Sequence, residues 1–281
     1  MLSSVWQTVS QALLSSFPLV NLILVLLAGC LGTLLFGKIH SPAREVLLRA
    51  LGLLALLMGA VELWNGFFVL QTAQFETTGT LLVLLSVLVG LAFGYALSLD
   101  RAIGQGGIWL FRQFIKDKPS RAEIIARAKG EEIARPRKVR EPSAEGFMLA
   151  TVLCAFSSTT VFSTLAYTSA EDPLPFLLRL GFHAVVFFLL AALYGTNVTF
   201  AVIPVLAVEG IILLMSHLCG DLITNTLMNQ LRLIGGVMLV MAGLSMGSGK
   251  RVRAPRLIPA YLVPVLYGFV LFLATKLTET A

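Results

Sequence analysis

Three groups of polar side chains lie inside long apolar stretches of this chain, and they are the residues best placed to do chemistry. Glu209 and His183 each fall near the middle of one such stretch. The third group is a run of four hydroxyl residues, Ser157, Ser158, Thr159 and Thr160. A charge at the centre of a membrane helix costs about 2.5 kcal/mol or more, so these residues are candidates for binding a substrate or ion. Glu209 and His183 could exchange a proton or hold a cationic group.

Each candidate also has a purely structural interpretation. Glu209 can hydrogen-bond to a neighbouring helix, and His183 can be a satisfied packing residue. Hydroxyl residues often bond back to their own helix or contact another one. A rise of roughly 1.5 Å per residue places all three groups near the same depth, which favours a shared site. Three further candidates lie nearer the outer face, where snorkelling or interfacial pairing explains them equally well. They are Glu62, Arg179 and Arg232.

Catalytic and cofactor motifs are missing from the sequence. It contains no H-E-x-x-H, G-x-S-x-G, P-loop or dinucleotide fingerprint. Cys219, Gly220 and Asp221 fall short of an intramembrane aspartyl protease signature, because no second membrane aspartate accompanies them. Cys30, Cys154 and Cys219 have no metal-ligand spacing such as C-x-x-C. We therefore expect no enzyme, no cofactor and no metal site.

The elements that position these residues follow from composition. The chain is 57% hydrophobic and 13% charged, with a mean hydropathy of +0.87, which is typical of an integral membrane protein. A spanning helix needs roughly 20 apolar residues, and eight runs reach or nearly reach that length. They cover residues 18–36, 46–68, 79–98, 146–167, 174–194, 199–217, 228–247 and 258–275. Backbone groups in hydrocarbon must be satisfied within a segment, so we predict an all-α polytopic fold with about eight transmembrane helices.

The basic residues predict the orientation of these helices. Of 21 Lys and Arg, 18 follow the first helix, lie between residues 101 and 140, or follow the seventh helix. These positions share one side of the membrane if eight helices alternate, and the positive-inside rule makes that side cytoplasmic. Both termini are then external. The net charge of +6 is thereby explained without nucleic acid.

Two segments of the chain resemble each other. Residues 48–62 match residues 231–245 at a constant offset of 183, with five identities in fifteen positions. An even number of crossings separates the two segments, so they should run antiparallel. We therefore predict an inverted repeat of helices one to three and six to eight, an architecture common in secondary transporters.

The repeat suggests an organisation in four parts. They are an interfacial segment with the first repeat (1–98), a cytoplasmic basic loop (99–145), a central helix pair (146–197) and the second repeat (198–281). The loop can be a solvated connector or a helix on the membrane surface that uses Ile108 and Phe111. Pro204 and Pro264 interrupt the sixth and eighth helices and predict kinks or hinges.

Glycine spacing predicts close helix contacts. Gly90 with Gly94, and Gly243 with Gly247, form G-x-x-x-G patterns that allow helix backbones to approach each other. Packing within one chain explains them, and the alternative is the seam of a homodimer.

Residues 21 to 274 resemble the YqgA/YdfK-like family of bacterial inner-membrane proteins, whose function is unknown. The residues that carry the resemblance are Gly29 to Gly37, Leu51 to Gly59, Gly146, Phe147, Cys154, Leu190, Ala191, Gly195, Ile203 to Val205, Gly210, Gly235, Gly236, Gly243 and Ile258 to Ala260. The resemblance implies a polytopic protein of the bacterial inner membrane, of a kind often labelled a transporter, and it supplies no substrate.

The chain departs from that family at two motifs. Where members usually carry Lys-Ser-x-x-Asp-Gly in the fifth helix, this chain has Arg179, Leu180, His183 and Ala184. Where they have Gly-Asp-Pro after the fourth helix, it has Glu171, Asp172 and Pro173. His183 thus stands in the place of the family's fifth-helix aspartate.

These observations together favour a secondary transporter or ion-coupled permease for a small solute across the bacterial inner membrane. A non-transporting membrane scaffold or regulatory subunit is the alternative, and a channel is a third. The expected partners are the lipid bilayer, an unidentified small molecule or ion, and in the homo-oligomer interpretation a second copy of the chain. A polar cavity open to one side would favour transport, and a sealed midplane would favour the scaffold.

Overall fold

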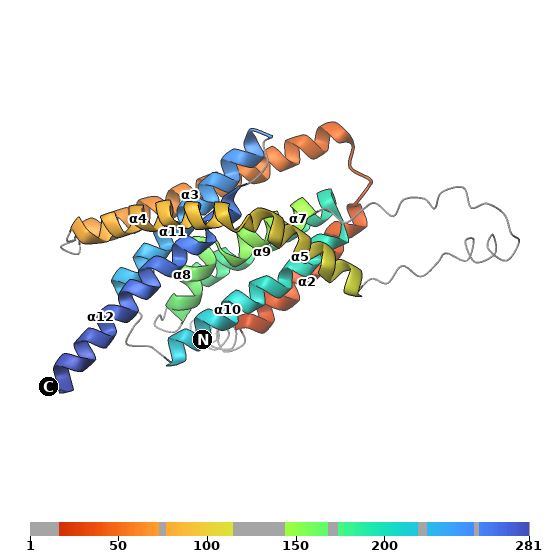
Figure 1. Ribbon diagram of the computed structural model, residues 1–281. Helices are drawn as coiled ribbons and strands as arrows, with labels where there is room; N and C mark the ends of the chain where they lie inside the picture. The colour runs from red at the N-terminus through yellow and green to blue at the C-terminus, as the bar shows by residue number, and fades with distance from the viewer. Residues whose placement is uncertain are drawn as a thin grey trace, which may run out of the picture.

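The computed structural model describes residues 17–72, 77–114, 144–167, 174–218, 224–249 and 253–280, and its regular structure in these ranges is helical throughout (Figure 1). The elements are α2 (Phe17–Leu35), α3 (Ser41–Thr72), α4 (Thr77–Ala96), α5 (Leu99–Phe114), α7 (Ala144–Ala155), α8 (Ser158–Tyr167), α9 (Leu174–Tyr194), η1 (Thr196–Ala201), α10 (Val202–Leu218), α11 (Asn225–Gly247), η3 (Ala254–Tyr261) and α12 (Leu262–Thr280). The predicted all-α class is confirmed.

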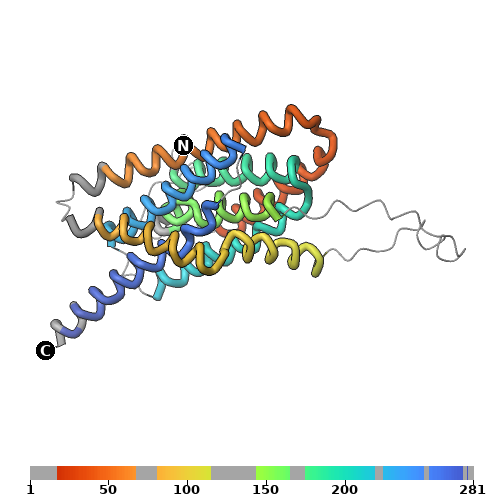
Figure 2. Tube along the Cα trace, turned by 45° about the horizontal axis from the view of Figure 1, so that its top comes forward, coloured from red at the N-terminus to blue at the C-terminus, as the bar shows by residue number. Residues whose placement is uncertain are grey.

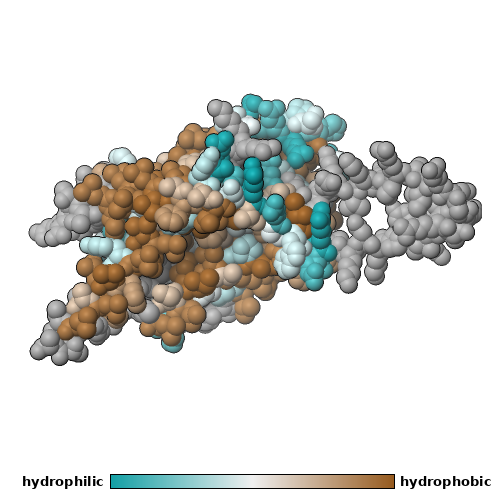
Figure 3. Space-filling model, viewed as in Figure 1, coloured by the Kyte–Doolittle hydropathy of each residue, from teal (hydrophilic) through white to brown (hydrophobic). Residues whose placement is uncertain are grey.

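The lengths of these helices match a bilayer. In the described part of the chain, seven spans are long and apolar enough to cross a membrane, and α4 with α5 makes an eighth if that pair is one span bent by 58°. Apolar side chains cover most of the face seen in Figure 3, and polar ones gather toward the end where α3 begins and α5 ends. The chain is therefore a multi-pass membrane protein, as its composition predicts.

The helices form an inner and an outer layer. The span that contains α7 and α8 is the most enclosed, with α9 and α11 beside it, and Leu149, Phe187 and Met238 of these helices are fully buried. α2, α3, α4, α10 and α12 lie outside them and expose rows of leucine, such as Leu88 of α4 and Leu266 of α12. Exposed leucine is stable against lipid, so the outer layer is the lipid-facing surface.

Several spans are interrupted. α7 ends at Ala155 and α8 begins at Ser158, so the predicted span 146–167 is two half-helices. α10 and α12 each follow a 3-10 segment, and Pro204 and Pro264 lie in their first turns. Proline is tolerated in a first turn, where its missing N–H would have no partner within the helix. The predicted interruptions therefore take the form of 3-10 to α junctions.

α3 and α11, which carry the two similar segments, pack against each other and run antiparallel (Figure 2). A Cβ atom on Gly52 would lie 2.9 Å from the carbonyl oxygen of Gly243, and one on Gly59 would lie 2.9 Å from that of Gly236. Only glycine permits backbones to approach so closely. The antiparallel orientation agrees with an inverted repeat, and the superposition of the two triplets stays a prediction.

The G-x-x-x-G pattern of Gly90 and Gly94 also packs within the chain. A Cβ atom on Gly90 would lie 2.5 Å from Cβ of Ala260, and one on Gly94 would clash with the backbone of Arg256 in η3. α4 is thereby fixed against η3. These glycines are used inside one molecule, and a homodimer stays a prediction.

The first part of the predicted loop 99–145 is helix α5, which belongs to the bundle. Its buried glycines Gly104 and Gly107 face Ala144 and Phe147 of α7. The small residues on this face allow α5 to dock, which hydropathy alone does not indicate. The rest of the loop, including Ile115, and the predicted interfacial segment before residue 17 lie outside the described residues.

Candidate functional site

The break between α7 and α8 lies beside a buried network of polar side chains, the polar centre, which includes Thr160, Arg179 and Glu209. Ser157 Oγ accepts a hydrogen bond from the backbone N–H of Thr160 at 3.3 Å, as a serine does when it caps a helix. The hydroxyl of Thr160 donates to the carbonyl of Cys154 at 2.6 Å, and that of Tyr261 donates to the carbonyl of Phe156 at 2.7 Å. Two carbonyls left over at the end of α7 are thus satisfied by side chains, which makes the break tolerable inside a membrane protein.

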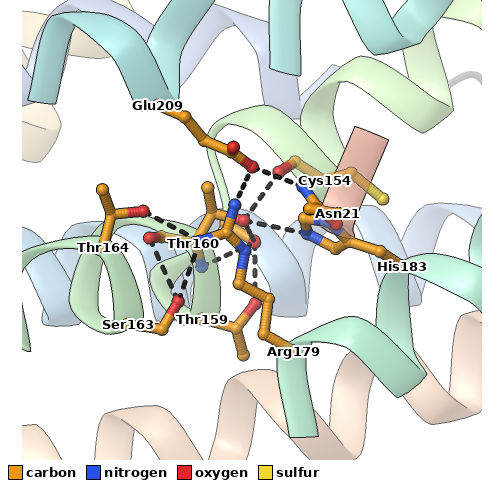
Figure 4. A network of polar contacts seen from close by, with 10 residues as sticks. Asn21, Cys154, Thr159, Thr160, Ser163, Thr164, Arg179, His183 and Glu209 are labelled. Atoms are coloured by element: carbon orange, nitrogen blue, oxygen red, sulfur yellow. Dashed lines mark hydrogen bonds and ion pairs between the residues drawn. The ribbon is translucent and has the colours of Figure 1, made fainter. Parts of the chain in front are cut away.

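An ion pair between α9 and α10 lies next to this break (Figure 4). Arg179 Nη2 donates to Glu209 Oε1, and both side chains are buried. Arg179 Nη1 donates to Thr164 Oγ1 at 2.8 Å and to Ser163 Oγ at 3.2 Å on α8. Glu209 Oε1 also accepts from Nδ2 of Asn21 on α2, at 2.5 Å. Four helices therefore meet at one buried charge pair.

Asn21 joins this ion pair to the histidine. His183 Nδ1 lies 3.1 Å from Asn21 Oδ1, and His183 Nε2 lies 3.0 Å from Thr160 Oγ1. The two ring nitrogens of His183 are therefore held by the Asn21 amide oxygen on one side and by the Thr160 hydroxyl on the other. Asn21, Ser157, Thr160, Arg179, His183 and Glu209 are each no more than 1% exposed.

One oxygen of the glutamate stands apart from the network. Glu209 Oε2 is buried and has no hydrogen-bond partner among the described residues. An unsatisfied buried oxygen is costly, and in native proteins it usually has an explanation in a ligand, a water molecule or a functional role. Glu209 Oε2 is therefore the atom of this centre at which a proton, a water molecule or a ligand could bind.

Comparison with known proteins identifies the family. A family model described as "Protein of unknown function (DUF554)" matches residues 17–269. This chain belongs to the DUF554 family. It is also 23% identical over 128 residues to the "Uncharacterized membrane protein YdfK" of Bacillus subtilis (strain 168), over 46% of this chain and 56% of that protein. The match thus spans about half the length of YdfK, and no solved structure matches. The YdfK-like resemblance is confirmed.

The structure of this DUF554 protein brings most of the predicted candidates together. Glu209 and His183 are connected through the Asn21 side chain, where the sequence suggests contact within about one bridging water. Ser157 Oγ lies 2.8 Å from Thr159 Oγ1 and 3.0 Å from Thr160 Oγ1. Ser158 is the exception. Its backbone packs on Gly235 of α11, and its buried hydroxyl has no partner in the described part of the chain.

Arg179 departs from its predicted surroundings. The sequence suggests a snorkelling or interfacial side chain, but the guanidinium is fully buried and paired with Glu209. Its position as the sixth residue of α9 is near the helix end, as predicted, but the side chain turns inward because Glu209 and two hydroxyls supply buried partners. The network residues that sequence reasoning missed are Asn21, Ser163 and Thr164. Asn21 is an isolated polar position in an apolar helix, and Ser163 with Thr164 continues the hydroxyl-rich stretch that begins at Ser157.

A second ion pair flanks α8. Arg232 of α11 pairs with Glu62 of α3, and these side chains are 12% and 11% exposed. The Arg232 guanidinium also lies 4.2 Å from the ring centroid of Phe162 on α8, within range of a cation–π interaction. The pairing suggested by the sequence is therefore present. α8 lies between this pair and the Arg179–Glu209 pair.

Proposed function

We propose that this DUF554 protein is a secondary transporter for a small solute, in which the network around Arg179 and Glu209 forms the binding region. The supporting observation is the fully buried Arg179–Glu209 pair beside a broken membrane helix. Replacing a buried ion pair by apolar residues is often neutral or stabilising. A pair buried at such a position is therefore better explained by function than by stability.

The broken helix supports the same proposal. Secondary transporters commonly bind solutes where discontinuous helices expose their ends inside the membrane. The N-terminal end of α8 lies inside the bundle, and its first turn carries Thr159 and Thr160 of the network. The positive end of a helix dipole at this point favours an anionic group.

The network is closed off from solvent. In the proposed transporter this arrangement would be a closed state, and transport would require further states open to each side. α8 is the element suited to that movement, since it is a half-helix that begins at a break. The same burial favours the second candidate, a static membrane scaffold.

Labelling of a cysteine in the network separates these two functions. In a background without Cys30, Cys154 and Cys219, Ser163→Cys should react with an impermeant thiol reagent from either side of the membrane. We expect labelling about 10- to 1,000-fold slower than at an exposed position, because open states populate about 0.1–10% of molecules. Failure of Ser163→Cys to react from both sides supports the scaffold, and fast simultaneous reaction from both sides supports a channel.

Two matched variants calibrate this measurement. Glu45→Cys, at an exposed position on α3, should react quickly from one side. Ala150→Cys, fully buried in the apolar part of α7, should not react from either side. Labelling of Ala150→Cys at the rate of Ser163→Cys would show unfolding in place of alternating access.

The orientation in the membrane is a further expectation. We propose a bacterial inner-membrane location with the segment between α5 and α7 cytoplasmic and both termini external, because most of the basic residues then share the inner side. A cysteine at Lys129, which lies outside the described residues, should resist an impermeant reagent in intact cells and react after permeabilisation. Reaction in intact cells would reverse the assignment.

A further inference from the structure

We infer that the solute is a small monocarboxylate carried together with one proton, with Glu209 taking the proton and Arg179 binding the carboxylate. The inference rests on the proposed transport function and specifies its substrate class. Two observations carry it: donors converge on one oxygen of Glu209, and the other oxygen has no hydrogen-bond partner within the part of the chain that the structure describes.

The first observation defines a place for an oxyanion. Glu209 Oε1 receives one hydrogen bond from Arg179 and another from the amide of Asn21. A guanidinium and an amide N–H are donors, and Arg179 has no acceptor atom to offer. Ser163 and Thr164 hold the guanidinium in this direction from the other side. In the empty protein the Glu209 carboxylate thus occupies the position that a ligand carboxylate would fill.

The second observation provides the proton site. Glu209 Oε2 is buried without a partner among the described residues, so an O–H bond can form there without displacing an existing hydrogen bond. Protonation makes Glu209 neutral and weakens its hold on Arg179 and Asn21. The side chain can then rotate away, and both donors become available to a second carboxylate.

Charge balance couples the two events. In the described part of the chain, the charged or titratable groups facing this centre are Arg179 and His183 on α9, Cys154 on α7 and Glu209 itself; α2 and α8 contribute only the Asn21 amide and hydroxyls. Protonation of Glu209 removes the carboxylate charge that the structure places against the buried arginine, and losing one partner of a buried ion pair is strongly unfavourable. One monoanion restores neutrality. One proton and one carboxylate therefore enter together and leave together, and the loaded centre carries no net charge.

The same balance selects the class of solute. A dicarboxylate or a doubly charged phosphate would bring a second negative charge, and the network offers no second cation among the described residues, because Arg232 is paired with Glu62 on the other side of α8. The closed centre already accommodates one carboxylate group, that of Glu209. A small monocarboxylate matches the charge and the donors of this centre.

Uptake by the full chain in liposomes tests the inference, with radiolabelled lactate as the probe. Wild-type protein should accumulate lactate when the outside is acidic, above the leak of protein-free liposomes. Glu209→Gln mimics the protonated state, so it should retain lactate exchange and lose about tenfold or more of the pH-driven accumulation. Arg179→Gln should lose about tenfold or more of both. Glu45→Gln and Arg49→Gln, the same changes in an exposed ion pair, should behave as wild type.

Thermal unfolding of the wild-type protein tests the inference without relying on the folding of any variant. Lactate should raise the unfolding temperature more at about pH 5 than at about pH 8, where a carboxyl group is less readily protonated. Stabilisation that is absent, or larger at the higher pH, overturns the inference. The inference is also overturned if the Arg179→Gln variant accumulates lactate as the wild type does. The same holds if lactate uptake by the Glu209→Gln variant remains driven by the pH gradient. If Ser163→Cys opens to both sides and lactate is not carried, the substrate class is wrong while transport stands.

Discussion

Glu209→Leu is expected to lower the free energy of unfolding by about 3–5 kcal/mol, because it leaves the buried charge of Arg179 without a counterion. The double variant Arg179→Met with Glu209→Leu should recover most of that loss, since removing both charges removes the need to bury either. Denaturation in mixed micelles measures both values. The two together form a thermodynamic cycle for the pair.

The exposed pair of α3 provides the matched control. Glu45 and Arg49 are 65% and 62% exposed, and such pairs contribute about 0–1 kcal/mol. Glu45→Leu should therefore change stability little. If the double variant in the network is as unstable as Glu209→Leu alone, the arginine and glutamate do not act as a unit, and the functional argument from their pairing fails.

Gly243→Ala is expected to destabilise the protein by about 1–3 kcal/mol, the usual cost of adding an atom to a packed contact. The new Cβ would lie 2.5 Å from the carbonyl oxygen of Gly52 and 2.7 Å from the backbone nitrogen of Leu56. Both neighbours are backbone atoms of α3, so the helices themselves must separate. Thermal unfolding of the two forms in detergent measures the difference.

Gly247→Ala is the control for this prediction, on the same helix and in the same G-x-x-x-G pattern. Among the described residues, no atom outside the adjoining backbone of α11 lies within 4 Å of a Cβ placed at Gly247, so the change should be neutral or slightly stabilising through helix propensity. Equal destabilisation by both alanines would show that the glycines are needed for some reason other than contact with α3.

Hydropathy predicts the helices well because each spanning segment must satisfy its own backbone in lipid. It also singles out Glu209 and His183, since isolated polar residues stand out against apolar sequence. The same reasoning does not find the break at Ser157, because the run from 146 to 167 stays apolar on both sides of it. Ser157 caps α8 by accepting a hydrogen bond from the backbone N–H of Thr160. In the sequence this capping residue cannot be distinguished from the other hydroxyl residues of the run.

Side-chain direction is what the sequence could not provide. Depth along a helix places Arg179 near the outer end of α9, but only the packing of α8 and α10 turns it inward toward Glu209. Asn21 is an isolated polar residue in the first half of α2, and its role depends on a glutamate 188 positions later in the chain. Contacts of this range arise from how helices pack, which hydropathy does not specify.

The glycine seam between α3 and α11 has a mechanical consequence. The backbones of α3 and α11 are in direct contact at Gly52, Gly59, Gly236 and Gly243, so the helices cannot slide past each other without separating. The two helices should therefore travel as one body. Any change of shape must occur where longer side chains separate the elements, along the surfaces that α8 shares with α9 and α10. In the proposed transporter the similar segments at residues 48–62 and 231–245 would then form a fixed frame, and α8 would be the element that moves against it.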